Sequence, residues 1–244
     1  MGTTLPPLYV HQITLRNCGR FVHVSADFGS EYTTHVHLSS EMLYAGLTRE
    51  RSRKPRAFRD AMDSYRFSQD FDLRQLPLWF TVAILEQPKS RRTVDVHKFN
   101  STLESVPGVQ TNDRLPKYGS METVLPDQSF RTFAVSPDRQ VLEGFMDGQI
   151  FWMGKKRTMF QITALDTVYG ATWEQGACRT PPIQIGPEEV RQFEAMQVLA
   201  ATQRCLVVQG QLRDAPYLGL GGHADDRASG IPALALGPLL GEGG

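Results

Sequence analysis

The sequence predicts an α+β fold, and three observations support this class. Short runs that alternate apolar and polar residues recur along the chain, which is typical of half-buried strands. Helical spacing is rare, and strands and helices do not alternate regularly as they do in a parallel α/β protein. Hydrophobic residues make up 41% of 244 residues, enough for a buried core. The predicted architecture is an RRM-like or ferredoxin-like core with long insertions and a projecting thumb hairpin. A β-rich sandwich is the alternative.

Two strands and one helix are predicted in the first fifth of the chain. Leu8–Arg16 alternates in hydrophobicity and predicts a strand, and Arg20–Ala26 predicts a second strand joined to it by a tight turn. Apolar residues at helical spacing follow, and they end at Leu47. Ser39 or Ser40 can cap this short helix through its hydroxyl group.

The middle of the chain contains the strongest strand signal. Trp79–Leu85 is a short, almost continuous apolar run, which predicts a central strand covered on both faces. Residues 87–118 are rich in turn-forming residues and are predicted to be a loop, whereas Phe130–Val135 predicts a strand. Residues 149–165 predict a hairpin with apolar legs.

A helix, a strand and a tail are predicted for the last quarter. Pro187 suits the first position of a helix, and two glutamates follow it near the positive end of the helix dipole. Phe193, Met196, Val198 and Leu199 give this predicted helix a partial apolar face. Arg204–Leu212 predicts a closing strand. Residues 216–244 are rich in Gly, Ala, Pro and Leu with little periodicity, which predicts a flexible tail or an extension that docks on a partner. The domain is therefore predicted to span residues 1–215.

Charge argues against a stand-alone DNA-binding protein. The formal net charge is zero, although residues 1–100 carry 14 Lys and Arg against 10 Asp and Glu, and the remainder carries 12 against 16. A free nucleic-acid-binding domain usually has a basic excess over its whole length. A subunit inside a larger ribonucleoprotein needs only one basic face, so this class of protein stays open.

Composition also predicts a cytoplasmic protein that does not contact a membrane. No run approaches the about 20 apolar residues of a membrane helix, and residues 1–7 lack the basic and apolar regions of a secretion signal. Cys18, Cys178 and Cys205 are odd in number and far apart. No Cys-x-x-Cys pair exists, so neither a disulfide framework nor a zinc ribbon is expected.

The sequence lacks the motifs of several enzyme classes. It has no phosphate-binding loop, no dinucleotide-binding glycine motif, no Gly-x-Ser-x-Gly and no His-Glu-x-x-His. His35 and His37 would point to one face of a strand as metal ligands do, but no third ligand cluster accompanies them. We therefore expect no metal, no cofactor and no catalytic residue.

Dense cations mark two kinds of candidate nucleic-acid contact. Cations at such density neutralise phosphates and release counterions. The hairpin tip and the turn after the first strand are predicted to bind RNA through Lys155, Lys156, Arg157, Arg16 and Arg20. Two longer segments are predicted to contact DNA or a partner protein through Arg49, Arg51, Arg53, Lys54, Arg56, Arg59, Lys89, Arg91 and Arg92.

The order of these features over residues 8–212 resembles a known family. After the opening strand come Phe28-Gly-Ser-Glu-Tyr32 and then Leu38…Leu43-Tyr-Ala-Gly-Leu47. They are followed by Pro116-Lys-Tyr-Gly119, the strand Phe130–Val135 and the Gly154-Lys155-Lys156 hairpin. This order resembles the Cas-five-family subunit of type I-D CRISPR surveillance complexes, also called Csc-one.

The resemblance implies a non-catalytic subunit that holds the 5′ handle of the CRISPR RNA and helps position target DNA near the protospacer-adjacent motif. It also implies contacts with a large, Cas-ten-like subunit and a repeated, Cas-seven-like backbone subunit. The alternative is a metal-independent endonuclease of the same fold that processes CRISPR RNA. Its candidate groups are His23, His35 and Lys155, because general acid–base cleavage of RNA needs a base and a nearby cation. A scaffold protein that binds no nucleic acid is a third hypothesis.

Overall fold

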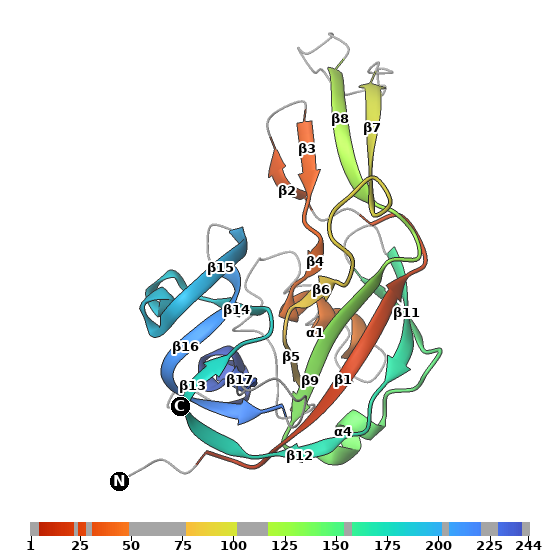
Figure 1. Ribbon diagram of the computed structural model, residues 1–244. Helices are drawn as coiled ribbons and strands as arrows, with labels where there is room; N and C mark the ends of the chain where they lie inside the picture. Colours follow the sequence, from red (N-terminus) through yellow and green to blue (C-terminus); the bar gives the residue numbers. More distant parts are fainter. Residues whose placement is uncertain are drawn as a thin grey trace, which may run out of the picture.

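The protein is a mostly antiparallel β structure with few helices (Figure 1). The computed structural model describes residues 5–21, 24–27, 31–48, 77–101, 117–153, 158–201, 205–220 and 229–240. Their strands form three sheets, which we name A, B and C. Antiparallel sheets with few helices agree with the predicted class at the level of α+β or β-rich.

Sheet A is the central sheet and contains eight strands. Six of them form its main path, and two short strands pair with inner members. In spatial order the path is β10 (Ile150–Met153), β11 (Thr158–Leu165), β1 (Leu8–Asn17), β9 (Ser129–Ser136), β6 (Ala83–Leu85) and β4 (His37–Leu38); β12 (Tyr169–Ala171) pairs with β1, and β5 (Trp79–Phe80) pairs with β9. The predicted strand at 8–16, the strand at 130–135 and the hairpin at 149–165 are confirmed.

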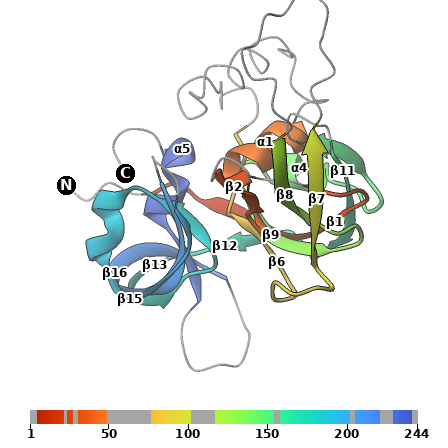
Figure 2. The ribbon, with the colours of Figure 1, turned by 90° about the horizontal axis from the view of Figure 1, so that it is seen from above.

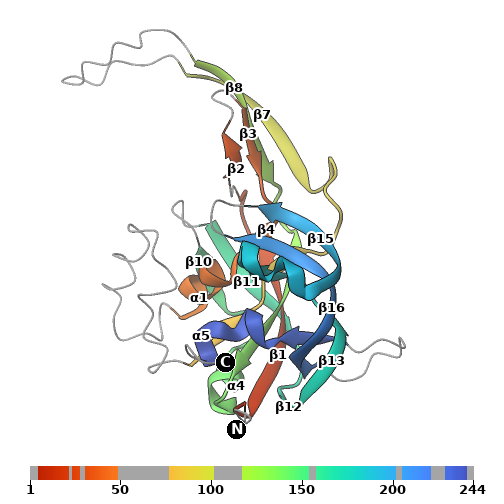
Figure 3. The same cartoon turned by 90° about the vertical axis from the view of Figure 1, so that its left-hand side faces the viewer.

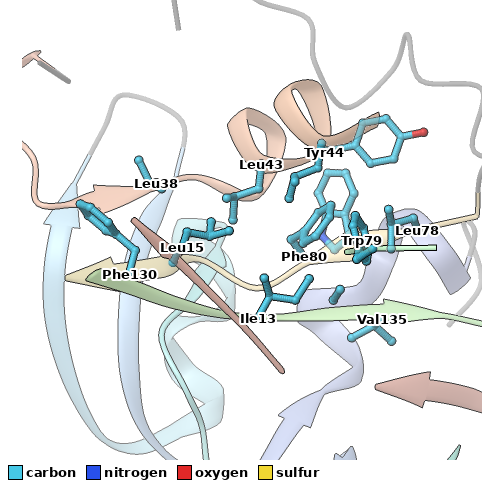
Figure 4. Close-up of a cluster of buried hydrophobic side chains, with 14 of the residues drawn as sticks. Ile13, Leu15, Leu38, Leu43, Tyr44, Leu78, Trp79, Phe80, Phe130 and Val135 are labelled. Atoms are coloured by element: carbon cyan, nitrogen blue, oxygen red, sulfur yellow. The ribbon is translucent and has the colours of Figure 1, made fainter. Parts of the chain in front are cut away.

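Two helices pack on the same face of sheet A. Helix α1 (Ser40–Thr48) joins β4 to the segment that leads to β5, and helix α4 (Arg139–Glu143) follows β9. The register pairs Leu15 with Phe130 and Ile13 with Thr132, so these side chains share one face. Figure 4 shows Ile13, Leu15 and Phe130 beneath Leu43 of α1. The ring of His11, on the same face, contacts the Leu142 carbonyl of α4.

Local chemistry explains where α1 begins and how closely it packs. The Oγ of Ser39 accepts a hydrogen bond from the Met42 amide at 3.3 Å, which confirms the predicted cap. A Cβ on Gly46 would lie 2.5 Å from Cγ of Met153 and 3.1 Å from the Phe151 ring. The missing side chain therefore lets α1 approach β10 closely.

The predicted strand Trp79–Leu85 is interrupted. β5 and β6 both pair with β9, but Phe80 lies opposite Ala134 whereas Ile84 lies opposite Arg131, so one extra residue sits between the two pairings. Such a bulge breaks the ladder and bends the strand. At the bulge, the Thr81 hydroxyl accepts a 3.0 Å hydrogen bond from the Phe133 amide, so this backbone donor keeps a partner. The segment is buried, as predicted, apart from the half-buried Ile84.

Sheet B is an arm that projects from the core (Figures 1 and 3). Its strands, in spatial order, are β2 (Val24–Asp27), β3 (Glu31–Thr34), β8 (Lys117–Val124) and β7 (Val94–Ser101). Two predictions are wrong here. The segment 87–118 contains strand β7 and the start of β8, and the predicted second strand pairs with β3 and not with the first strand. Phe21 makes only an isolated bridge to Val124.

Sheet C is built by the last third of the chain and lies beside sheet A, at the side away from β11 (Figure 2). Its strands and short helices are β13 (Trp173–Arg179), β14 (Ile183–Ile185), η1 (Pro187–Gln192), β15 (Phe193–Ala201), β16 (Leu206–Gly219), β17 (Gly230–Pro232), η2 (Ala233–Leu236) and α5 (Gly237–Leu240). All its other strands pair with β16. Pro187 opens a short 3-10 helix as far as Gln192, and the second half of the predicted helix is strand β15.

The prediction of a flexible tail at 216–244 is wrong for its described residues. Residues 216–219 continue β16, and β17 pairs with them. Leu218, Ile231 and Leu236 are fully buried and belong to the same cluster as Leu8 and Val10 of sheet A. The predicted boundary after residue 215 therefore lies inside strand β16. The sequence pattern does not reveal this, because the buried apolar residues of the segment do not recur at a regular period.

Candidate nucleic-acid interface

The face of sheet A opposite the helices is open over part of its area. Val10 and Val135 pair on this face and are fully buried at the end near sheet C. Toward the other end of β1, Gln12, Thr14 and Arg16 are only partly buried. The open area therefore covers the second half of β1 and the β10–β11 hairpin.

The hairpin exposes apolar side chains on this face. Phe151 and Met153 point into the core against α1, so Ile150 and Trp152, which alternate with them, point to the opposite face. Trp152 lies opposite Met159 in the ladder. Ile150, Trp152 and Met159 are 44%, 45% and 36% exposed, which is unusual for large apolar side chains in a strand.

Arg16 lies next to this apolar group. The ladder places Gln161 between Ile150 and Arg16, and the guanidinium donates a 2.7 Å hydrogen bond from Nη2 to the Gln161 side-chain oxygen. Asp127 is 3.9 Å away from Nε of Arg16, and both side chains are well exposed, so this ion pair is loose. We name Ile150, Trp152, Met159, Gln161 and Arg16 the hairpin platform.

The central strand β9 contributes less to the open face. Arg131 points to this face and pairs with Glu86 of the segment after β6. Phe133 is partly buried and packs against the core. The Arg131 side chain is 54% exposed against 42% for Arg16, but its guanidinium is held by Glu86. The exposed aromatic side chain and the more loosely paired cation of this face are therefore on the edge hairpin and at the end of β1.

The predicted site residue Arg20 lies at the base of the arm. Its Nη1 donates to Asp95 Oδ2 at 3.0 Å and lies 3.3 Å from the Thr123 hydroxyl, and it also contacts the His97 ring. The hydrogen bond from Arg20 to Asp95 is the main reason why the pKa of Asp95 is lowered. Arg20 thus joins the loop after β1 to both strands β7 and β8.

The turn between β6 and β7 presents Arg91 and Arg92 to solvent. Thr93 organises it: the Ser90 amide donates to the Thr93 hydroxyl at 2.8 Å, and the Thr93 amide donates to the Ser90 carbonyl at 3.0 Å. Neither arginine has an ion-pair partner among the described residues. The turn therefore fixes the backbone while both guanidinium groups stay available.

Lys89, in the same turn, is occupied by an acidic partner. Its Nζ lies 2.7 Å from Oε2 of Glu122, which also accepts from the Thr34 amide at 3.1 Å. Burial acts to raise the pKa of Glu122, but the hydrogen bonds from Lys89 and Thr34 outweigh it and the pKa is lowered. Lys89 thus ties the turn to the arm.

The other predicted contacts lie outside the described residues. They are Arg49, Arg51, Arg53, Lys54, Arg56, Arg59, Lys155, Lys156 and Arg157. Among the predicted contacts that the structure describes, Arg91 and Arg92 lie in one turn. Arg16 bonds Gln161 of β11, whereas Arg20 bonds Asp95 of β7. Sequence reasoning missed Trp152 and Met159. The alternation in residues 150–153 was a usable signal, because it places Trp152 and Phe151 on opposite faces.

Of the alternative catalytic set, only His35 lies in the described part of the chain. The rings of His35 and His37 lie 4.6 Å apart, whereas His23 and Lys155 lie outside the described part of the chain. Over the ranges that the structure describes, no three His, Cys, Asp or Glu residues are grouped closely enough to hold a metal ion. In the same ranges, no helix has the length and apolar character of a membrane span.

His11 makes stability depend on pH. Burial lowers the pKa of His11, and the hydrogen bond with Leu142 and the nearby Asp166 oppose this only partly. The unfolded chain binds a proton near pH 6.5, whereas the folded chain binds it only at lower pH. We therefore expect the free energy of unfolding to fall between pH 7.5 and 5.5, by up to about 1.4 kcal/mol per pH unit. Denaturant titrations of the wild type and His11→Gln measure this difference, and equal slopes in both would contradict it.

Comparisons with known proteins give likenesses to solved structures and no match in sequence. No family model matches the chain, and no curated protein is similar to it. One similar structure is a chain of the Type III-B Cmr-beta bound to cognate target RNA, with TM-score 0.39 and 12% identity over 67% of this chain. This chain spans 61% of the length of that one.

A second similar chain comes from the Type III-B Cmr-beta bound to cognate target RNA and AMPPnP. It has TM-score 0.44 and 8% identity, and the match covers 83% of this chain and 86% of that one. Both TM-scores are below 0.5, so the proposals that follow rest on the residues and geometry of this chain.

Proposed function

We propose that this protein is a non-catalytic, RNA-binding subunit of a CRISPR ribonucleoprotein of the Cas-five type. The observation that carries the proposal is the arrangement of sheet A. Along the chain its central elements follow the order β1, α1, β6, β9, α4 and β11, with the strands in the spatial order β11-β1-β9-β6. This is the βαββαβ order of ferredoxin-like domains.

An RRM-type sheet binds single-stranded RNA on the face that its helices leave free. Here the helices cover one face, and the opposite face exposes Arg16, Trp152 and Met159. We propose that the arm formed by β7 and β8 corresponds to the thumb. At the base of this arm, the positively charged side chains of Arg91 and Arg92 face solvent. These features together supply a stacking surface and phosphate contacts.

The finer role comes from the order of sequence features over residues 8–212. In this proposal the protein holds the 5′ handle of a type I-D CRISPR RNA in the cytoplasm, next to a large subunit and the first backbone subunit, near the site where target DNA is read. Co-expression with those subunits, followed by sequencing of the co-purified RNA, tests this role. One RNA species of uniform length with a constant 5′ end is the expected result.

Binding of RNA by the isolated chain should weaken steeply as salt increases. Cations that neutralise phosphates release counterions, and for a single strand the log–log slope is about −0.7 per contact. Replacing Arg91 and Arg92 by alanine should therefore make the slope less negative by about 1.4. Fluorescence anisotropy with a labelled single-stranded RNA over a salt series measures both slopes.

Arg139→Ala is the matched control. Arg139 is a surface arginine of α4 that pairs with Glu143 at 2.7 Å, on the helix-covered face of the sheet. Its removal should leave the slope unchanged. An affinity that does not vary with salt would contradict the phosphate contacts, and RNA cleavage by the purified chain without metal would contradict the non-catalytic role.

A further inference from the structure

We propose that the hairpin platform is a base-stacking site for an unpaired nucleotide of single-stranded RNA, with Trp152 as the stacking surface. This inference rests on the proposed RNA-binding function and adds the place and chemistry of one contact. In an RRM the stacking aromatics lie on the two central strands. Here the open face of those strands carries one aromatic side chain, Phe133 of β9, which is partly buried against the core. The exposed aromatic side chain of this face, Trp152, lies instead on the edge strand β10.

The geometry of the platform suits a flat ring. Trp152 and Met159 are direct cross-strand neighbours, and Ile150 stands two residues from Trp152 on the same face, so the three form a continuous apolar surface. Every base has a π face that can stack on an indole, which makes such a surface tolerant of sequence. Sulfur atoms of methionine also pack favourably against aromatic rings. One base fits on this surface with its edge toward Gln161.

The charges beside the platform favour RNA over a protein segment as its occupant. Arg16 uses Nη2 for Gln161 and holds Asp127 only loosely, so its remaining guanidinium hydrogens have no acceptor among the described residues at hydrogen-bond distance. A stacking surface beside a cation is a combination that single-stranded nucleic acid uses. An apolar protein segment would leave these guanidinium hydrogens of Arg16 without a partner.

The support of the platform is rigid. Phe151 stacks on Phe160 with ring centroids 5.9 Å apart, and Met153 packs against α1 at Gly46. These contacts lie directly beneath Trp152 and Met159, on the other face of the same two strands. The backbone that carries the indole is therefore held by the core, so a base would meet a preformed surface.

The test compares a decauridine RNA with an oligomer of the same length in which every nucleotide lacks its base. The full-length wild type, Trp152→Ala and Trp152→Phe are titrated with both probes at low salt. We expect Trp152→Ala to weaken binding of decauridine on the order of 10-fold, and Trp152→Phe to restore most of it. For the abasic probe the wild type and Trp152→Ala should bind alike, because no base is present to stack. Met146→Ala is the matched control, since Met146 is 64% exposed and lies outside the platform.

The outcomes separate the site from the function. If the wild type binds neither probe, the proposed function fails and this inference with it. If the wild type binds decauridine and Trp152→Ala binds it equally well, the stacking site is overturned while RNA binding stands. Equal losses with both probes would show that Trp152 acts on the fold and not on a base, which also overturns the site. If Trp152→Ala binds both probes as the wild type does but no longer co-purifies with a co-expressed subunit, the occupant of the platform is a protein.

Discussion

Truncation after Leu212 is expected to abolish the cooperative unfolding transition. It removes residues 215–218, which pair with Trp173–Gly176 of β13, and it removes β17 and η2. The apolar side chains of Leu218, Ile231 and Leu236 are then lost from the core. Each fully buried side chain of this size contributes about 1.5–3 kcal/mol, and the stability of a whole domain is only about 5–15 kcal/mol.

Circular dichroism during heating measures the transition, and truncation after Leu240 is the control because it leaves β17, η2 and α5 complete. Leu236→Ala gives a graded version if the short form cannot be purified. It should lower the free energy of unfolding by about 2–5 kcal/mol. A short form that melts at the wild-type temperature would show that the C-terminal segment contributes nothing to the core.

Asn17→Ala is expected to destabilise the protein by about 2–4 kcal/mol, a decrease in Tm of roughly 5–15 °C. Asn17 is fully buried at the end of β1. Its amide nitrogen donates to the carbonyls of Gly19 at 2.8 Å and Leu125 at 2.7 Å, and its oxygen accepts from the Gln128 amide at 2.8 Å. Alanine leaves all three backbone groups without this partner.

The loop that Asn17 holds contains one residue in a left-handed conformation. Asp127, in the same turn, has φ of 62°, a left-handed conformation that the surrounding hydrogen bonds support. Gln128→Ala is the matched control, since the Gln128 side chain bonds only the Pro126 carbonyl at the surface and should matter by less than about 0.5 kcal/mol. Chemical denaturation of the two variants compares them. Equal stability in both would mean that solvent replaces the amide of Asn17 at no cost.

Strand β7 shows why the prediction from sequence failed for the arm. Val94–Ser101 begins with alternating residues, yet the turn-forming residues of the same region predict a loop. The arm projects from the core, so both of its faces meet solvent, and Val96 is 55% exposed. A strand without a buried face produces a weak hydrophobic alternation, so the pattern could not identify it.

Part of the candidate interface follows from the sequence. Charge alone makes Arg16, Arg91 and Arg92 candidates, and the structure places all three at least partly in solvent. Charge did not reveal that Lys89 is held by Glu122 or Arg20 by Asp95, because those pairs join residues 33 and 75 positions apart. Trp152 was missed because an aromatic residue in a strand is more often part of a core than exposed.

Elements with local signals can be predicted from the amino-acid sequence. β1, β9 and the β10–β11 hairpin follow from period-two patterns, and α1 follows from the Ser39 cap and helical spacing. The neighbours of each strand, the free face of sheet A and the contribution of residues 230–236 to the core become visible only in the folded protein. The physical reason is that pairing and burial depend on contacts between distant segments, such as Leu15 with Ile162, and local patterns do not encode these partners.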